Sequence, residues 1–331
     1  MKKAVLTGVG GPEKLEIVET ESPVPGKDEV LIRVKHAGVA FADVIMRRGK
    51  YLGAPKFPLT PGYDVCGEIT KLGPGVEGLQ VGDTVLAFTQ FGGYAEEVAT
   101  KTVRVFKAPA DINSAEGASL VLNYITAHQI LTGYAALKSG QTILVYSAAG
   151  GVGTAALQLA RVMGLKAYGA CSSGKTEIVR EYGAIPIDYK SEDVASRLRE
   201  LEPNGVDMVL DPIGGEHLEE SRALVKTGGF LICFGFFSAF SGDALTGGLG
   251  STIRRMLALR FLQRRVKARF YSVNPNNRAK NEASMRELLA LYEARKIKPL
   301  IGADLPLTEV REAHRLLTSG GSRGKIVLNC S

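Results

Sequence analysis

The middle of the chain alternates between two patterns of hydrophobic and polar positions. Short apolar runs, typical of buried strands, are each followed by a longer segment in which apolar residues recur every three or four positions, as on the buried face of a helix. The expected strands are 143–147, 166–171, 185–187, 207–211 and 229–234, and the expected helices are 152–164, 174–182, 191–200 and 215–225. This alternation predicts a parallel, doubly wound sheet of the Rossmann type with right-handed crossovers.

The segments before and after this region have different patterns. Residues 1 to about 118 contain short alternating runs separated by glycine and proline, which indicate a β-rich domain with one helix near 41–49. Further helices are expected at 115–122, 127–137, 281–295 and 307–318, and further strands at 269–273 and 324–328. The chain is therefore expected to be an α/β protein with two differently built parts.

The strand at 143–147 is joined to the next helix by a glycine-rich turn. Gly150, Gly151 and Gly153 lack Cβ atoms, so the turn can be tight and a diphosphate can come close to the backbone. The free N–H groups and the dipole at the start of the helix favour negative charge. An ordinary strand–helix turn is the alternative, but the order of strand, turn, helix and strand favours a dinucleotide site. Its expected members are Ala149, Gly150, Gly151, Val152, Gly153 and, in the next strand, Gly169.

The end of the second strand indicates which dinucleotide is bound. A site that prefers NAD(H) usually has an acid there, which binds the ribose 2′-hydroxyl group, but residues 169–175 contain none. Ser172 can donate a hydrogen bond and Lys175 carries a point charge, and both groups suit a 2′-phosphate. A solvated side chain is the alternative for Lys175, although a cation near a helix N-terminus is unfavourable without an anionic ligand. NADP(H) is the expected cofactor.

Composition narrows the remaining functions. The 331 residues, of which 45% are hydrophobic and 23% charged, suffice for two cores. No apolar run approaches the roughly 20 residues that span a bilayer, and the N-terminus lacks the apolar stretch of a signal peptide. The four cysteines are far apart in the sequence, which favours a reducing, cytoplasmic setting over a disulfide framework.

The net charge of +7 is concentrated in one segment. Residues 254–269 contain seven arginines and lysines and no acid, which equals the excess of the whole chain. A basic amphipathic helix from Arg254 to Arg269 can bind an anionic membrane surface. A helix packed on the protein with its arginines in solvent is the alternative. Nucleic-acid binding is disfavoured because no pattern of stacking aromatic residues accompanies the charge.

Three stretches resemble the medium-chain dehydrogenase/reductase superfamily. They are PGYDVCGEI at 61–69, GVEGLQVGDTV at 75–85, and AAGGVG at 148–153, the last in the form found in zeta-crystallin-like quinone oxidoreductases. Within that branch, FAD at 41–43, NYITA at 123–127 and DPIGG at 211–215 are similar to the vesicle amine transport protein homologues. The resemblance covers nearly the whole chain.

This resemblance implies a division into domains. A GroES-like catalytic domain would occupy residues 1–122, and a Rossmann domain that binds NADP(H) would occupy residues 123–266. Residues 267–331 would return to the catalytic domain. The active site would be the cleft between the two domains, and the protein would be a homodimer.

The resemblance also implies further residues of the cofactor site. Phe234, Gly235 and Phe236 would line the nicotinamide end together with Thr126. Tyr189 would contact the 2′-phosphate. Packing in the core is the alternative for the residues at the nicotinamide end.

Two tyrosines are the candidates to polarise the acceptor or to donate a proton. Tyr51 and Tyr63 would face the family's cleft, although a packed aromatic ring in a loop is the alternative for Tyr51. Ala40 stands where relatives have an asparagine that points toward the nicotinamide, so a side-chain hydrogen-bonding group is lost at this position.

The zinc-binding members of the superfamily have ligands that this chain lacks. Ala40 stands at the position of a ligand cysteine, Tyr63 replaces the histidine of the GHE motif, and the four-cysteine lobe is missing. A structural or surface role is expected for each of the scattered histidines, His36, His128, His217 and His314. We therefore expect no metal, which disfavours an alcohol dehydrogenase because the Lewis acid is missing.

The expected reaction is hydride transfer from NADPH to a quinone or an α,β-unsaturated carbonyl compound. The cofactor supplies the hydride chemistry, and the protein orients and polarises the acceptor. The alternative is an NADPH-binding adaptor at the membrane periphery, with little turnover.

Overall fold

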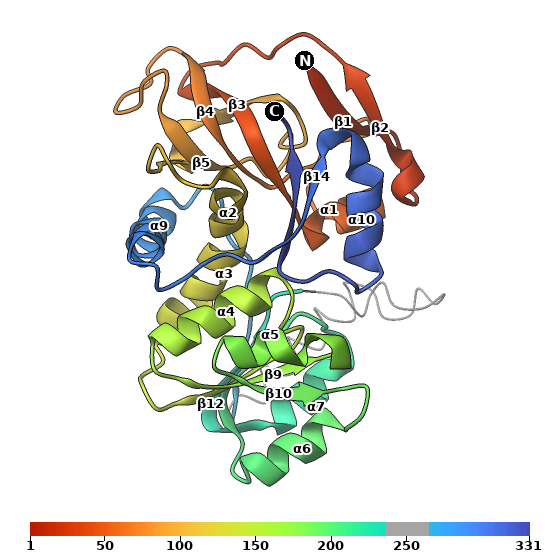
Figure 1. The fold of residues 1–331 in the computed structure, drawn as a ribbon, viewed down its shortest axis with the longest axis vertical. Helices are drawn as coiled ribbons and strands as arrows, with labels where there is room; N and C mark the ends of the chain where they lie inside the picture. The colour runs from red at the N-terminus through yellow and green to blue at the C-terminus, as the bar shows by residue number, and fades with distance from the viewer. Residues whose placement is uncertain (236–264) are drawn as a thin grey trace. The chain divides into compact units, whose positions relative to one another are not determined.

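The computed structural model describes residues 1–235 and 265–331 (Figure 1). These residues form two compact units, one of Met1–Ile125 with Asn274–Ser331 and the other of Thr126–Val273. Each unit contains its own cluster of buried hydrophobic side chains. The predicted α/β fold class is confirmed, because one unit is rich in antiparallel strands and the other is built on a parallel sheet.

The unit Thr126–Val273 contains a six-stranded sheet in the order β10-β9-β8-β11-β12-β13, and all its pairs are parallel. Its strands are β8 (Thr142–Val145), β9 (Lys166–Cys171), β10 (Ile185–Asp188), β11 (Val206–Asp211), β12 (Val225–Cys233) and β13 (Lys267–Phe270). The helices that follow them are α4 (Gly151–Val162), α5 (Thr176–Glu181), α6 (Val194–Leu201) and α7 (His217–Ala223). The strand order reverses beside β8, as in the predicted Rossmann fold, and ligands of such sheets bind outside the carboxyl ends of the strands at that point.

Local sequence explains how these elements form. Every residue of β11 is buried, because helices cover both faces of a parallel sheet. Helix α6 begins after Asp193, whose carboxylate accepts a hydrogen bond from the N–H group of Ser196 at 2.7 Å. Helix α4 begins at glycine without a side-chain cap, so the first N–H groups of this helix stay available.

The unit that contains both chain ends is built on a seven-stranded sheet, with β14-β15-β3-β4-β5-β7 in order and β6 paired to β3. The strands are β3 (Glu29–Val39), β4 (Asp64–Leu72), β5 (Thr84–Phe88), β6 (Glu97–Lys101), β7 (Val105–Lys107), β14 (Ile301–Pro306) and β15 (Lys325–Asn329). The strands β1 (Lys2–Leu6) and β2 (Leu15–Glu19) form a separate antiparallel pair. Figure 1 shows the blue C-terminal strand β15 beside the orange strand β3, its antiparallel partner.

The helices of this unit are α1 (Phe41–Arg47), α2 (Ser114–Ser119), α9 (Arg278–Glu293) and α10 (Val310–Thr318). The helices predicted at 115–122 and 127–137 form a more irregular run. Helix α2 continues as a π-helical turn at Leu120–Tyr124, then as α3 (Ile125–His128), and then as a second π-helical turn at Gln129–Tyr134. Strand β13 pairs with β12, so residues 267–270 belong to the parallel sheet, whereas we expected the tail to leave that domain at 267.

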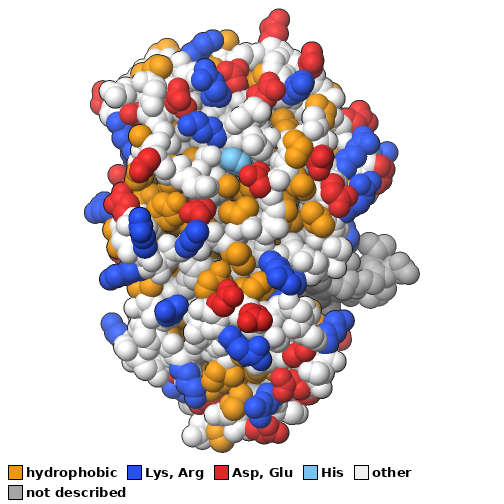
Figure 2. All heavy atoms as spheres, viewed as in Figure 1, with side chains coloured by type: hydrophobic (Ala, Val, Ile, Leu, Met, Phe, Trp, Pro, Cys, Tyr) orange, Lys and Arg blue, Asp and Glu red, His pale blue; other side chains and the backbone are white. Residues whose placement is uncertain are grey.

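Charged side chains are mixed on the visible face of the described residues, where Figure 2 shows blue lysines and arginines interspersed with red acids. This agrees with a net charge that the sequence concentrates at 254–269. Most of that segment lies outside the described residues, so its predicted helix does too. Among the described helices, none combines the length and the hydropathy that a membrane span requires.

Candidate active site

Two glycines, Gly153 in the turn after β8 and Gly169 in β9, are packed too closely for larger residues. A Cβ atom on Gly153 would collide with the carbonyl oxygen of Ser147 and lie 2.7 Å from that of Ala148. A Cβ atom on Gly169 would lie 2.8 Å from the Cβ atom of Ala148 and 2.7 Å from a methyl group of Val179. Gly169 is buried in β9, so its contribution to the site is to let the turn pack on that strand.

The start of α4 has the properties of an anion site. The N–H groups of Gly151, Val152 and Gly153 belong to the first turn, where a helix leaves its N–H groups without intrahelical partners. The first turn of α4 contains no acidic residue. Ala149 is buried just before the helix, and Gly150 precedes α4 with an extended backbone. The residues predicted for the turn are therefore together at the start of α4, where a diphosphate could bind.

The residues predicted for the 2′-phosphate lie at the ends of two paired strands. Lys175 is in a 3₁₀ turn at Ser173–Lys175, and its N–H group donates to the carbonyl oxygen of Ser172 at 2.8 Å. Tyr189 follows β10, is 52% exposed, and donates its N–H group to the carbonyl oxygen of Cys171 at 3.2 Å. Parallel pairing of β9 and β10 thus brings Ser172, Lys175 and Tyr189 to the same edge of the sheet.

One acid near this edge was missed in the sequence. Asp188 ends β10, and hydrogen bonds from the Ser173 hydroxyl group and from the N–H group of Lys190 lower its pKa. The Asp188 carboxylate is therefore stabilised in its ionised form by Ser173 and Lys190 of the neighbouring turns. Pairing of β10 with β9 is the signal that could have found it, because residue 188 then lies beside the end of β9.

The residues predicted for the nicotinamide end differ in their surroundings. Thr126 is buried, and its hydroxyl group is hydrogen-bonded to that of Tyr271. Phe234 is half-buried after β12, and a Cβ atom on Gly235 would collide with the backbone of Pro212. Phe236 lies outside the described residues. Thr126 is thus engaged within the fold, while Phe234 remains partly accessible.

The two candidate tyrosines lie together in the β-rich unit. The hydroxyl groups of Tyr51 and Tyr63 are hydrogen-bonded to each other. Tyr63 is only 4% exposed, and its ring contacts Phe88 edge-on at a centroid distance of 6.3 Å. Burial, and then Tyr51, raise the pKa of Tyr63 well above the usual value, so this hydroxyl group keeps its proton. Tyr51 is half-buried and is the more accessible of the pair.

A buried carboxylate holds the segment that precedes Tyr63. Asp43 of α1 is fully buried and accepts hydrogen bonds from the N–H groups of Ala40 at 2.8 Å and Gly62 at 3.0 Å. The hydroxyl group of Tyr94 donates to the same carboxylate at 2.9 Å, and Nε2 of His314 lies 3.3 Å from that hydroxyl group. Burial lowers the pKa of His314 to about 3, so this histidine is neutral. The network was not predicted, because its members are far apart in the sequence.

Asp43 should give the free energy of unfolding an unusual pH dependence. Burial, opposed by the backbone hydrogen bonds, raises the pKa of Asp43 from 3.8 to about 6. The folded protein then binds this proton more tightly than the unfolded chain, so the contribution of Asp43 to stability falls as pH rises from about 4 to 6. The expected loss is about 1.4 kcal/mol per pH unit, or about 3 kcal/mol in total. Urea unfolding of the wild type and of Asp43→Asn across this pH range measures it.

The relevant quantity is the difference in the free energy of unfolding between the two proteins at each pH, because all other groups titrate in both. Parallel pH profiles for wild type and Asp43→Asn would contradict the raised pKa. Asp193→Asn is the matched control, since hydrogen bonds to Ser196 lower the pKa of Asp193. Its contribution should change with pH in the opposite direction, being lost as the pH falls.

Comparison with known proteins identifies the family. Residues 26–110 match the alcohol dehydrogenase GroES-like domain, and residues 182–328 match the zinc-binding dehydrogenase family. The chain is 34% identical to the synaptic vesicle membrane protein VAT-1 homolog of Rattus norvegicus, over 98% of this chain and 83% of the relative. The chain belongs to the VAT-1 homologue family of medium-chain dehydrogenases/reductases. The predicted resemblance is confirmed.

Quinone oxidoreductases are further relatives of this VAT-1 homologue family member. The chain is 29% identical to the quinone oxidoreductase of Lama guanicoe over 99% of this chain and 97% of the relative. The solved structure of Escherichia coli quinone oxidoreductase complexed with NADPH is 27% identical and covers 99% of this chain and 100% of its own, with a TM-score of 0.90. The fold of the VAT-1 homologue family member is thus that of the quinone oxidoreductases.

The residues of this family member do not fit the zinc ion that one matching family description names. Asp64, which follows Tyr63, is 0% exposed, and Nζ of Lys325 lies 2.8 Å from its carboxylate. This carboxylate is therefore already paired with a lysine of the chain itself. His36 is hydrogen-bonded to Ser114, and His217 to Asp211. Within residues 1–235 and 265–331, no group of three or more His, Cys, Asp or Glu side chains could hold a metal ion. Zinc independence of the reaction stays a prediction.

Proposed function

We propose that the protein is an NADPH-dependent reductase that transfers a hydride to a quinone or an α,β-unsaturated carbonyl compound without zinc. The arrangement at the carboxyl ends of β8, β9 and β10 carries this proposal. It combines the start of α4, where Gly153 has no room for a Cβ atom, with Ser172, Lys175 and Tyr189. The similarity to a quinone oxidoreductase solved with NADPH supports it. The nicotinamide supplies the hydride when the cofactor is bound.

The residues of the parallel-sheet unit would bind and orient the cofactor. The N–H groups of Gly151, Val152 and Gly153 are available to a diphosphate. The ammonium group of Lys175 and the hydroxyl group of Ser172 would take the 2′-phosphate, which carries a charge of about −1.5 to −2 at neutral pH. Phe234 is available as an apolar wall for the nicotinamide end.

The tyrosine pair of the β-rich unit would act on the acceptor. Tyr51 would donate a hydrogen bond to a carbonyl oxygen of the acceptor, which stabilises the negative charge that develops there during hydride transfer. Tyr63, whose hydroxyl group is bonded to that of Tyr51, would hold Tyr51 in position. Asp43 binds the N–H groups of Ala40 and of Gly62, the residue before Tyr63, and would act through them as a positioning residue.

Replacing Tyr51 by phenylalanine should lower kcat about tenfold, because one hydrogen bond of about 1.4 kcal/mol to the transition state is lost. The affinity for NADPH should stay within twofold of the wild type. Tyr63→Phe is the comparison variant and should lower kcat less, because its buried hydroxyl group would act on the acceptor only through Tyr51. Steady-state assays with a quinone acceptor measure both effects, and a wild-type kcat for Tyr51→Phe would remove Tyr51 from the proposed reaction.

A panel of acceptors tests the function itself. Oxidation of NADPH and of NADH is followed with 1,2-quinones, alkenals and simple ketones, with and without a metal chelator. We expect turnover of the quinones or alkenals with NADPH, far weaker turnover with NADH, and no effect of the chelator. Tight NADPH binding without turnover of any acceptor would contradict the proposal and favour the binding protein described next.

The alternative function is an NADPH-binding adaptor at the membrane periphery, with little turnover. It is favoured by the similarity to synaptic vesicle membrane protein VAT-1 homologues and by the basic segment 254–269. Flotation with neutral and anionic liposomes separates it from the reductase, since charge reversal of Arg254 and Arg255 should abolish membrane binding and spare catalysis. We further propose a cytoplasmic homodimer, which light scattering of the purified protein and cell fractionation would test.

A further inference from the structure

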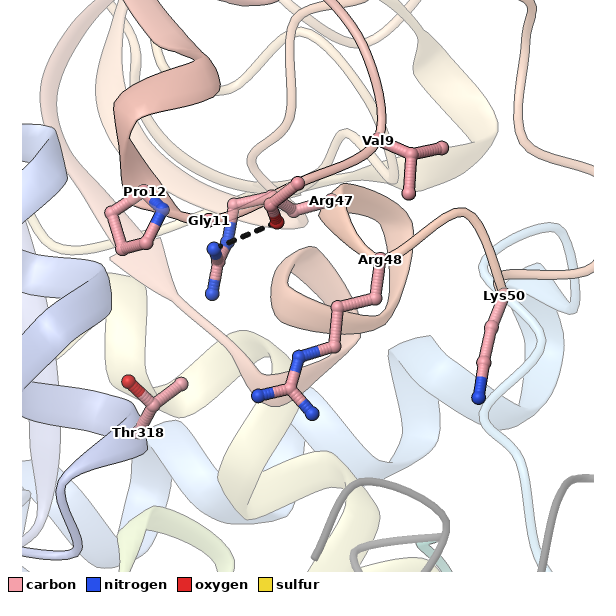
Figure 3. Close-up of a pocket in the computed structure, with 8 residues that line it drawn as sticks. Val9, Gly11, Pro12, Arg47, Arg48, Lys50 and Thr318 are labelled. Carbon is pink, nitrogen blue, oxygen red and sulfur yellow. Dashed lines mark hydrogen bonds between the residues drawn. The ribbon is translucent and has the colours of Figure 1, made fainter. Parts of the chain in front are cut away.

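A cavity of about 530 Å³ lies within the β-rich unit, at the end of helix α1 (Figure 3). The guanidinium group of Arg47 donates to the carbonyl oxygen of Gly10 at 3.0 Å, the bond drawn dashed in that figure, and Arg47 is only 2% exposed. This guanidinium group therefore fastens the loop after β1 to the helix, and we assign no ligand to the cavity. A more accessible charged group, the carboxylate of Asp188, lies at the end of β10 in the parallel-sheet unit.

The carboxylate of Asp188 lies beside the residues proposed for the 2′-phosphate. Asp188 is the last residue of β10 and pairs in register with Cys171, the last residue of β9, which Ser172 follows directly. Asp188 is half-buried, and Tyr189, the next residue, is exposed. The acid that selects NAD(H) in Rossmann folds stands at the end of the second strand. Asp188 brings an acid to the same edge of the sheet from the neighbouring strand.

Hydrogen bonds tie this carboxylate to the turn that follows β9. The N–H group of Lys190 donates to Oδ1 of Asp188 at 2.9 Å, and the hydroxyl group of Ser173 is hydrogen-bonded to the same carboxylate. The bond from Ser173 is the largest cause that lowers the pKa of Asp188, so this acid is ionised at neutral pH. Ser173 stands between Ser172 and Lys175 in the chain, and the negative charge is therefore fixed against the proposed phosphate-binding turn.

The charges of Asp188 and Lys175 act on the same part of the sheet. Burial, and then the charge of Asp188, raise the pKa of the Cys171 thiol to about 11, and the charges of Lys175 and Arg180 oppose this shift. The end of β9 is therefore within the range of Coulomb interaction of both the acid and the lysine. An anion bound at this strand end is attracted by Lys175 and repelled by Asp188.

We propose that Asp188 determines how strongly the protein selects NADP(H) over NAD(H), by repelling the 2′-phosphate that Ser172 and Lys175 would bind. This inference rests on the cofactor site of the proposed reductase. The 2′-phosphate carries a charge of about −1.5 to −2 at neutral pH, and a fixed like charge nearby lowers its affinity. NAD(H) has a hydroxyl group at this position, so the charge of Asp188 leaves its affinity nearly unchanged. Asp188 thus narrows the preference for NADP(H) that Lys175 creates.

The binding of two nucleotides to the full chain tests this role without any turnover. Adenosine 2′,5′-bisphosphate and 5′-AMP differ only in the 2′-phosphate, and isothermal titration gives the Kd of each. In Asp188→Asn the amide oxygen can still accept the hydrogen bonds from Ser173 and Lys190, but the charge is removed. We expect the Kd of the bisphosphate to fall about three- to tenfold in this variant, and that of 5′-AMP to change less than about twofold.

Two variants serve as controls. Asp188→Glu retains the charge and should leave the Kd of both nucleotides close to the wild-type values. Glu200→Gln removes one charge from exposed helix α6 of the same unit, where Glu200 is paired with Arg197 at 2.8 Å, and should leave the ratio of the two Kd values unchanged. Because salt screens the repulsion, the difference between wild type and Asp188→Asn should shrink as the salt concentration rises.

The outcomes separate this inference from the proposed function. A wild type that binds the bisphosphate no more tightly than 5′-AMP contradicts the 2′-phosphate site and, with it, the role of Asp188. A wild type that prefers the bisphosphate, with the same Kd in Asp188→Asn, overturns the role of Asp188 alone. Weaker binding of both nucleotides by Asp188→Asn would also overturn it, since the carboxylate then only supports the turn. If Asp188→Asn does not fold, Asp188→Ser removes the same charge and provides the same comparison.

Discussion

Replacement of Lys325 by methionine is expected to lower the free energy of unfolding by about 3 to 5 kcal/mol, the usual effect of breaking a buried ion pair from one side. Nζ of Lys325 lies 2.8 Å and 3.1 Å from the two carboxylate oxygens of Asp64, and the side chains are 2% and 0% exposed. Removing the ammonium group leaves a buried carboxylate whose pKa burial already raises. Urea unfolding at pH 7 measures the loss.

The double variant Asp64→Asn/Lys325→Met should recover most of this stability, because it removes the unpaired charge as well as its partner. Arg315→Met is the matched control, since it breaks an exposed pair with Glu312 in the same unit. Exposed pairs contribute about 0 to 1 kcal/mol, so little change is expected there. A loss below 1 kcal/mol for Lys325→Met, or a double variant as unstable as the single one, would contradict this interpretation of the pair.

The Lys175→Glu variant is expected to lose at least about a hundredfold in kcat/KM for NADPH, and to keep the value for NADH within a fewfold. The variant loses the charge proposed to bind the 2′-phosphate and sets a carboxylate against it, and such repulsion costs several kcal/mol. NADH has no phosphate at this position, so the same change leaves its binding nearly unaffected. Steady-state kinetics with both cofactors and a common acceptor measure the ratio.

Arg199→Glu on α6 provides the control for this variant. The residue is exposed, belongs to the same unit and undergoes the same change of charge. It should leave the ratio of NADPH to NADH activity unchanged. Equal losses with NADPH and NADH in Lys175→Glu would mean that this lysine contributes to the fold or to the turn rather than to the choice of cofactor.

The sequence pattern predicted those helices and strands whose structure follows from the hydrophobic period of their own residues. Helix α4 and strands β8 and β9 lie within a residue or two of the expected bounds, because their apolar positions follow the helical and strand periods. Strand β14 (Ile301–Pro306) was not predicted, since Gly302, Asp304 and Pro306 are poor strand residues. Its parallel pairing with β15 overrides that preference, and a single sequence does not reveal such a partner.

The candidate site likewise has a part that the sequence predicts and a part that it does not. The glycine turn was predictable because its residues are adjacent in the sequence and their missing Cβ atoms have a local reason. The network around Asp43 joins residues 43, 62, 94 and 314, and the pair of Asp64 with Lys325 spans 261 positions. The pair of Asp64 with Lys325 depends on strand β3, which pairs with both β4 and β15, and the Asp43 network joins α1, α10 and two loops, so no local pattern encodes either contact.

A single-turnover measurement of hydride transfer tests the central proposal most directly. Protein in excess is mixed with a limiting amount of NADPH, protiated or deuterated at the transferring position, and the nicotinamide absorbance is followed after addition of a 1,2-quinone. We expect complete loss of the reduced nicotinamide, slower with the deuterated cofactor, and no comparable reaction with NADH. Persistence of bound NADPH in the presence of every quinone and alkenal tested would contradict it.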